Sequence, residues 1–193
     1  MKIIGITGPS GAGKTTALNV LRQMGACVLD CDEIYHRLLS EDERLLQDIE
    51  AAFPNAVTGG DLDRKALGET VFADPTALQT LNRITHGRVC EEVLRLLDEC
   101  DSDLAAIDAI GLFESGLNRH CDLTVAVVAS EQTRIARLTA RDGISEHYAK
   151  QRIAAQRPAE DFSALCDLTL ENNGTPAEFE TACKAAFGRV LDI

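Results

Sequence analysis

The sequence has no hydrophobic run that approaches the roughly 20 residues a helix needs to span a membrane. It also has no C-x-x-C pair among its 7 cysteines, so the usual ligand spacing of a zinc site is missing. The first residues lead directly into a glycine-rich loop, which leaves no room for a cleaved signal peptide. We therefore expect a cytoplasmic protein whose cysteines are reduced thiols that pack as small hydrophobic groups.

Positive charge is scarce as well. The 19 Lys and Arg residues are outnumbered by 31 Asp and Glu residues, which gives a formal net charge of −12. This sign disfavours binding to a nucleic-acid backbone or an anionic membrane, and we expect neither partner. A small phosphate-bearing ligand remains compatible with it, because such a ligand needs only a local cluster of donors. With 193 residues, of which 45% are hydrophobic, the chain is expected to form one globular domain.

Short apolar segments alternate with helical patterns along most of the chain. Strands are expected at residues 2–7, 26–30, 104–109, 123–129 and 168–170. Helices are expected at residues 14–24, 131–141, 146–156 and 176–191. This alternation predicts an α/β fold with a central parallel five-stranded sheet flanked by helices. The segment 33–103 is almost entirely helical in pattern, with a turn at 58–61, and is expected to be a helical insertion.

The strongest motif lies between the first predicted strand and the first predicted helix. Residues 8–15 read Gly-Pro-Ser-Gly-Ala-Gly-Lys-Thr and fit the P-loop pattern G-x-x-x-x-G-K-[ST] in full. Glycines let backbone N–H groups surround phosphate oxygens at the start of a helix. Lys14 can reach the β- and γ-phosphates of a nucleotide, and the Thr15 hydroxyl can bind Mg²⁺. We assign the ATP site to Ser10, Gly11, Ala12, Gly13, Lys14, Thr15 and Thr16.

A P-loop alone does not separate a GTPase, a motor ATPase and a small-molecule kinase. No N-K-x-D sequence of the GTPase type is present. The segment 134–157 holds six cationic residues and only two acidic ones, Asp142 and Glu146. A lid that closes over transferring phosphates would need such a local excess, which favours a kinase. The alternative is an exposed helical hairpin with solvated charges.

Two carboxylates follow the second predicted strand. Residues two apart in a strand share a side, so Asp30 and Asp32 are expected to project together near the carboxyl edge of the sheet. A carboxylate there can accept the proton of a substrate hydroxyl that attacks a γ-phosphate. The alternative is that one of the two only caps the following helix.

Later blocks of the sequence add a family resemblance. The pattern D-x-D at residues 30–32 is followed by L-D-R-x-x-L-x-x-x-V-F at 62–72 and by L-N-x-I-x-H at 81–86. Three shorter patterns come later in the chain: R-D-G at 141–143, R-I-x-x-Q at 152–156 and N-x-G at 172–174. In this order, and with the P-loop, they resemble the dephospho-coenzyme A kinase family, which performs the last step of coenzyme A synthesis. The match covers nearly the whole chain.

The resemblance implies an ATP- and Mg²⁺-dependent P-loop kinase that phosphorylates the ribose 3′-hydroxyl of dephospho-coenzyme A. Asp32 would orient and deprotonate that hydroxyl, while Lys14 and Arg141 would stabilise the transferring phosphoryl group. Asn172 and Gly174 would lie beside the adenine. The acceptor would be contacted by Asp32, His36, Arg64, His86 and Asp108. The chain would be a single kinase domain with a core at 1–32 and 104–193, an acceptor-binding insertion at 33–103 and a lid at 134–157.

Several alternatives stay open at this point. Asp108 would hold Mg²⁺ through water or be a structural carboxylate. Arg64 and His86 would contact the acceptor or belong to a helix surface and the core. The whole protein could also phosphorylate another small molecule, such as a nucleoside monophosphate, or be a nucleotide-binding regulator without catalysis.

The sequence departs from the family pattern on the acceptor side. The family's D-x-P-L-L-F-E reads Asp-Ala-Ile-Gly-Leu-Phe-Glu at residues 108–114, so Ile110 and Gly111 replace a proline and a leucine. Gly87 stands where the family has proline after the histidine. His36 stands where the family has arginine, and Arg37 is displaced by one position. These changes leave the phosphoryl donor side intact.

Overall fold

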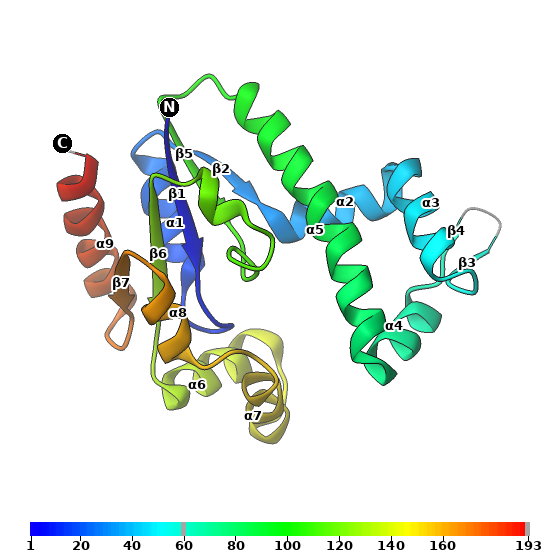
Figure 1. The fold of residues 1–193 in the computed structure, drawn as a ribbon. Coiled ribbons are helices and arrows are strands. Elements are labelled where there is room, and N and C mark those ends of the chain that lie inside the picture. The colour runs from blue at the N-terminus through cyan, green and yellow to red at the C-terminus, as the bar shows by residue number, and fades with distance from the viewer. Residues whose placement is uncertain (59–60, 192–193) are drawn as a thin grey trace. The chain divides into compact units, whose positions relative to one another are not determined.

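The computed structural model describes residues 1–58 and 61–191. The chain divides into two compact units (Figure 1). The first comprises Met1–Leu29, Cys100–Phe113 and Leu117–Ile193, and the second comprises Asp30–Glu99 and Glu114–Gly116. The functional organisation as one kinase domain with an acceptor-binding insertion and a lid stays a prediction.

The first unit is built on a five-stranded parallel sheet in the order β2-β5-β1-β6-β7. Its strands are β1 (Lys2–Thr7), β2 (Cys27–Asp30), β5 (Leu104–Asp108), β6 (Leu123–Val128) and β7 (Leu168–Glu171). Each lies within one or two residues of its predicted range. The predicted α/β fold is confirmed.

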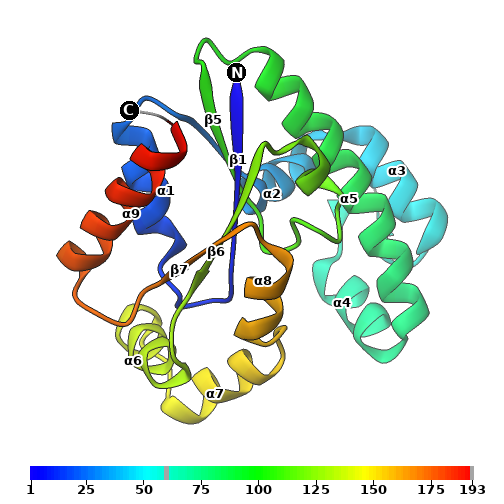
Figure 2. The ribbon, with the colours of Figure 1, turned by 60° about the vertical axis from the view of Figure 1, so that its left-hand side comes forward.

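Helices cover both faces of this sheet, which is why its strands are apolar almost throughout (Figure 2). On one face, α1 (Lys14–Gln23) and α9 (Pro176–Leu191) share a core with β1 and β6. On the other face, Ala126 and Val128 of β6 pack against Phe162 of α8 (Ala159–Leu165). Alternate residues of β6 therefore serve opposite layers.

The polar helices of the first unit follow β6. The helix α6 (Glu131–Asp142) begins after Ser130, whose side chain caps it, and ends at Gly143, which adopts the left-handed conformation. The helix α7 (Glu146–Ala154) ends two residues before its predicted end. The 3₁₀ turn at Leu117–His120 and the helix α8 were not predicted from the sequence. None of the described helices is long and apolar enough to cross a membrane.

The second unit contains four helices and a small hairpin within the described residues. The helices are α2 (Cys31–Glu41), α3 (Glu43–Ala52), α4 (Arg64–Ala73) and α5 (Pro75–Asp98). The strands β3 (Val57–Thr58) and β4 (Asp61–Leu62) pair antiparallel, and Gly59 and Gly60 of the predicted turn lie outside the described residues. Each helix begins after an aspartate whose carboxylate accepts backbone N–H groups, namely Asp30, Asp42, Asp63 and Asp74.

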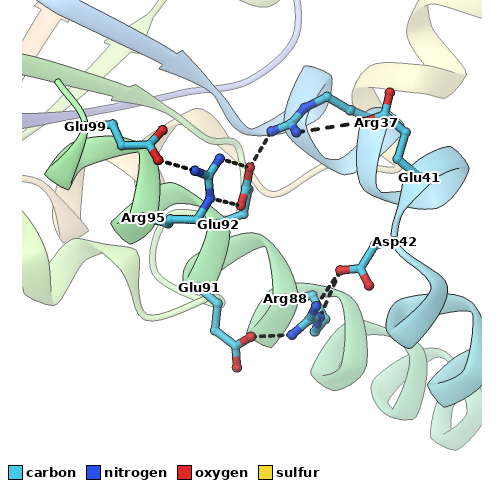
Figure 3. A network of polar contacts seen from close by, with 8 residues as sticks. All are labelled: Arg37, Glu41, Asp42, Arg88, Glu91, Glu92, Arg95 and Glu99. Carbon is cyan, nitrogen blue, oxygen red and sulfur yellow. Dashed lines mark hydrogen bonds and ion pairs between the residues drawn. The ribbon is translucent and has the colours of Figure 1, made fainter.

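A network of ion pairs ties α2 and the start of α3 to α5 (Figure 3). Arg37 of α2 lies 2.6 Å from Glu92, and Arg88 lies 2.5 Å from Asp42, the cap of α3. Hydrogen bonds from Arg95 and then Arg37 hold the pKa of Glu92 at about 2. The network fixes the packing of the three helices by charge as well as by their apolar faces.

The expectation that all cysteines are reduced thiols is wrong for two of them. Cys27 and Cys100 form a disulfide although 73 positions separate them in the sequence. Because β2 and β5 are neighbours in the sheet, the first residue of β2 and the segment that leads into β5 come close, with 6.5 Å between the two Cα atoms. The free cysteines are Cys31, Cys90, Cys121, Cys166 and Cys183.

Candidate functional site

The P-loop connects β1 to α1 in the first unit and depends on three glycines. Gly8, Gly11 and Gly13 have φ angles of 140°, 79° and 101°, which side chains other than glycine rarely adopt. A Cβ atom at Gly8 would collide with the carbonyl oxygen of Val127, and one at Gly13 with the amide of Asn172. The glycines are therefore required both by the backbone conformation and by close packing.

The start of α1 is suited to an anion. Helices α2 to α7 each begin with an Asp or Ser side chain that caps backbone N–H groups, whereas α1 follows Gly13 and has no side-chain cap. Its first turn contains no acidic residue and begins with Lys14, Thr15 and Thr16. Uncapped N–H groups at the positive end of a helix form a ready site for phosphate.

The backbone carbonyl groups of the loop are bonded by side chains from elsewhere in the first unit. Arg134 Nε donates to the Ser10 carbonyl oxygen at 2.9 Å, and Arg137 donates to that of Ala12 at 3.2 Å. The Asn172 amide nitrogen also donates to the Ala12 carbonyl at 2.8 Å, while its oxygen accepts from Arg137 at 2.9 Å. These donors fix the carbonyl groups of the loop and so the direction of its peptide planes.

Lys14 and Asp108 are brought together, as their proposed roles require. Asp108 ends β5, where it pairs in register with Ile6 of β1. Its Oδ1 lies 3.9 Å from the Lys14 ammonium nitrogen, and both side chains are largely buried, with 15% and 14% exposed. Lys14 also donates to the Gly8 carbonyl at 3.3 Å. A cation and a carboxylate therefore lie side by side at the carboxyl edge of the sheet.

The predicted lid contains two kinds of arginine. Arg134 is buried and Arg137 is partly buried, and both donate hydrogen bonds to carbonyl oxygens of the P-loop. The predicted excess of cations in 134–157 therefore includes two arginines that are engaged with the protein's own backbone. Arg141 is 64% exposed and bonds its neighbour Asp142 at 2.6 Å, and Arg152 bonds the same carboxylate at 2.7 Å. Hydrogen bonds from Arg141 and then Arg152 lower the pKa of Asp142 to about 2.

The expected pairing of Asp30 and Asp32 on one side of a strand is wrong. The strand ends at Asp30, whose carboxylate accepts the N–H groups of Asp32 and Glu33 at 2.9 and 3.1 Å and caps α2. Asp32 lies in the first turn of that helix and is exposed. Because the last strand residue is also the N-cap, the helix begins at the next residue, Cys31. Asp30 therefore belongs to a strand and Asp32 to a helix, and the rule that residues two apart share a side does not apply to them.

The acceptor-side residues lie in the second unit, apart from Asp108. His36 follows Asp32 by one helical turn, which places both on one exposed face of α2. Burial raises the pKa of the intervening Tyr35, and the positive charge of Arg64, the first residue of α4, acts against this rise. Arg37, the displaced arginine, is engaged with Glu92 of α5.

His86 opens into a different part of the second unit. It lines a cavity of about 450 Å³ together with Gln79, Asn82, Arg83, Gly87, Glu114 and Ser115. In the described part of the chain, no hydrogen bond or ion pair joins His86 to Asp32, His36 or Arg64. The structure thus places Asp32 and His36 on α2, Arg64 at the start of α4 and His86 on α5.

Two predicted residues follow the last strand of the sheet. Asn172 is buried against the P-loop, as described above, whereas Gly174 is exposed two residues later. Their predicted place beside the adenine stays a prediction. Arg134, Arg137 and Gln156 touch the P-loop without having been assigned a separate role from the sequence. The fixed spacing of the R-I-x-x-Q block was the signal that could have drawn attention to Gln156.

Comparison with known proteins adds to this geometry. A family model described as dephospho-CoA kinase matches residues 2–178. A dephospho-CoA kinase of Geobacter sulfurreducens is 36% identical over 185 residues, which cover 93% of this chain and 94% of that protein. One from Thermus thermophilus is 35% identical over 188 residues, which cover 97% of this chain and 91% of that protein.

Solved structures agree with these sequence matches. A crystal structure of a Thermus thermophilus protein has a TM-score of 0.81 at 35% identity and covers 97% of each chain. A dephospho-CoA kinase from Campylobacter jejuni has a TM-score of 0.67 at 24% identity and covers 98% of each chain. A shikimate kinase from Acinetobacter baumannii, at 17% identity and a TM-score of 0.58, shares the fold, with 100% of this chain and 94% of that chain covered.

Proposed function

Because this chain belongs to the dephospho-CoA kinase family, we propose that its P-loop holds ATP while Asp32 activates the acceptor. The γ-phosphoryl group of ATP passes to the ribose 3′-hydroxyl of dephospho-coenzyme A, and the products are coenzyme A and ADP. The hydroxyl proton goes to Asp32 as the new O–P bond forms and the bond between the γ-phosphorus and the bridging oxygen breaks.

The uncapped start of α1 is the observation that carries the donor half of this proposal. Backbone N–H groups of the loop after Ser10 bind the phosphates, and Lys14 stabilises the charge on the transferring group. Arg141 is exposed on the lid and, with its guanidinium, clamps the same group when the lid closes. Asn172 and Gly174 border the adenine.

The donor set suits Mg²⁺. Thr15 offers a hydroxyl at the start of α1, and Asp108 offers a carboxylate beside Lys14, which are the oxygen ligands that this cation prefers. Mg²⁺ commonly keeps several waters and binds through one or two protein groups and the substrate phosphates, so no larger protein cluster is needed. Thr15 would bind the ion directly and Asp108 through water, and the ion would neutralise charge on the β- and γ-phosphates.

Asp32 is the better candidate for the base because Asp30 already serves as a helix cap. In the described part of the chain, no hydrogen bond or ion pair engages the Asp32 carboxylate, which leaves it available to a hydroxyl. His36 on the same face, Arg64 at the start of α4 and His86 in the cavity of the second unit provide contacts for the acceptor. We place the enzyme in the cytoplasm, where its phosphoryl donor ATP is abundant.

A coupled assay of ADP release tests the function directly. Dephospho-coenzyme A should stimulate ADP release well above the ATPase background, whereas nucleoside monophosphates, shikimate and gluconate should not. Phosphorus NMR of the product should show a new 3′-phosphomonoester. Stimulation by a nucleoside monophosphate instead would identify another acceptor, and no stimulation by any of them would support a nucleotide-binding regulator.

The role of Asp32 is tested by Asp32→Asn with Asp30→Asn as the matched control. Asparagine keeps the shape but cannot accept the proton, so kcat should fall at least ~10²-fold while the affinity for ATP stays within about twofold. Asp30→Asn should change kcat little, because asparagine is also a good N-cap. If Asp30→Asn were the more damaging change, the two roles would have to be exchanged.

A further inference from the structure

The side chain of Gln156 holds one residue of the P-loop from outside. It follows α7 in the sequence, 146 positions after Ser10. Its Oε1 accepts the Ser10 backbone N–H at 3.0 Å, and its Nε2 donates to the Ser10 hydroxyl at 2.7 Å. A single amide group thus engages both the backbone and the side chain of Ser10.

Arg134 completes this arrangement. Only 4% of the residue is exposed, and its Nε donates to the Ser10 carbonyl oxygen at 2.9 Å. One of its terminal nitrogens donates to the Gln156 Oε1 at 3.2 Å. Within the described part of the chain, Arg134 makes no ion pair, so neutral oxygens of the P-loop and of Gln156 receive its hydrogen bonds. All polar groups of Ser10 are therefore held by two side chains.

Ser10 is the position in the loop where such a constraint matters. It follows Pro9 and is followed directly by Gly11, whose φ angle of 79° is one that side chains other than glycine rarely adopt, so the peptide unit between Ser10 and Gly11 is the one next to a glycine. A peptide unit next to glycine can rotate at little cost, and rotation would turn N–H groups of the loop away from a bound phosphate. Because Gln156 holds the N–H of Ser10 and Arg134 holds its carbonyl, both peptide units of this residue are fixed.

We propose that Gln156 is a positioning residue for the phosphoryl donor, which acts through Ser10 and with Arg134 to keep the N–H groups of the P-loop directed at the phosphates of ATP. The inference rests on the proposed ATP site and extends it to a side chain outside the loop. It also links the segment after α7 to the loop, so that displacement of this segment loosens the phosphate site.

Three variants and a control test this role. Gln156→Met keeps the length of the side chain and removes both hydrogen bonds to Ser10. Ser10→Ala removes only the bond to the hydroxyl, and the double variant combines the two changes. Gln132→Ala, at an exposed glutamine in the first turn of α6, is the control and should match the wild type. For each protein we would measure kcat, KM for ATP, KM for dephospho-coenzyme A and the affinity for a non-hydrolysable ATP analogue by calorimetry.

Gln156→Met should lower kcat/KM for ATP and the analogue affinity by about 10- to 100-fold, as for the loss of two hydrogen bonds to partly buried polar groups. KM for dephospho-coenzyme A should stay within about twofold, because Gln156 acts on the donor alone. Ser10→Ala should cause a smaller loss, and the double variant should match Gln156→Met, since both changes act on one contact.

Other outcomes would overturn the inference. An analogue affinity of Gln156→Met within twofold of the wild type would show that the amide only fills space. Additive losses in the double variant would show that Gln156 and Ser10 act separately, and an equal rise of both KM values would indicate general disorder of the fold. Failure of the wild type to release ADP would count against the proposed function instead, and the calorimetric comparison would still decide the role of Gln156.

Discussion

The disulfide between Cys27 and Cys100 allows a quantitative prediction about stability. Its ends are 73 positions apart, so it closes a long loop that contains the whole of the second unit except Glu114–Gly116. In the chain-entropy model, a cross-link over this separation restricts the unfolded chain by an amount worth about 4 kcal/mol at 25 °C. Given the usual unfolding entropy per residue, a chain of 193 residues should lose about 10 °C in Tm on reduction.

Thermal unfolding of the oxidised and reduced protein measures this effect. The oxidised protein, equilibrated with glutathione disulfide, should melt about 10 °C above the same protein in excess dithiothreitol. A double variant, Cys27→Ser with Cys100→Ser, should melt like the reduced protein and should not respond to the reductant. In denaturant, the oxidised wild type should show 5 reactive thiols, the free cysteines of the structure, and non-reducing peptide mapping should join Cys27 to Cys100.

Two results would refute the reasoning. A map that joins other cysteines would show that the neighbouring ends of β2 and β5 do not pair as described. A Tm difference below about 3 °C with the correct pair closed would show that the unfolded chain is already constrained or that closure disturbs the native sheet.

Gly13→Ala should weaken the binding of an ATP analogue and lower Tm. A φ of 101° costs a non-glycine residue about 1–2 kcal/mol, and the added Cβ atom would also collide with Asn172. An unchanged affinity in calorimetry would contradict this prediction. Arg141→Ala should lower kcat by about 10²-fold, and Arg141→Lys should keep part of the lost activity, because lysine retains the charge but not the planar guanidinium. Steady-state rates of the alanine variant within twofold of the wild type would show that Arg141 does not stabilise the transferring phosphoryl group. Hydrogen bonds from Arg95 and Arg37 lower the pKa of Glu92 from 4.5 to about 2, so Glu92 stabilises the fold above pH 4.5 and this contribution is lost as the pH falls towards 2. Glu92→Gln should flatten the dependence of the unfolding free energy on pH in that window, and an unchanged slope in urea titrations would contradict the ion pair.

The sheet could be predicted from the sequence because its three central strands, β5, β1 and β6, are buried on both faces. Each strand is a short apolar run bounded by turn residues, and such runs locate strands to within a residue or two. The helix α8 escaped prediction because it has 7 residues, follows Pro158 without a side-chain cap and buries one large side chain, Phe162. A helix this short carries too few apolar positions to show a period.

The candidate site could be predicted only in part. The P-loop was readable because its chemistry is local: the glycines, Lys14 and Thr15 lie within one stretch of chain. The roles of Arg134 and Arg137 could not be predicted. Both lie on α6, which follows β6, and they contact the loop after β1; this contact depends on the order of the strands in the sheet. The pairing of Cys27 with Cys100 could not be predicted either, because it depends on β2 and β5 being neighbours in the sheet.

The number of cations in the predicted lid segment does not by itself indicate which of them are available to bind a phosphate. Arg134 and Arg137 are bonded to carbonyl oxygens of the P-loop, where a positive charge orients peptide groups and is shielded from solvent. Arg141 and Arg152 remain partly exposed and share the single carboxylate of Asp142, so this group of three carries one net positive charge. In the proposed closed state, Arg141 would release Asp142 and bind the nucleotide, whereas Arg134 could bind a phosphate only by releasing the Ser10 carbonyl. One pair of arginines, Arg134 and Arg137, thus supports the backbone of the P-loop, and the proposed contact with phosphate on closure of the lid belongs to Arg141 of the other pair.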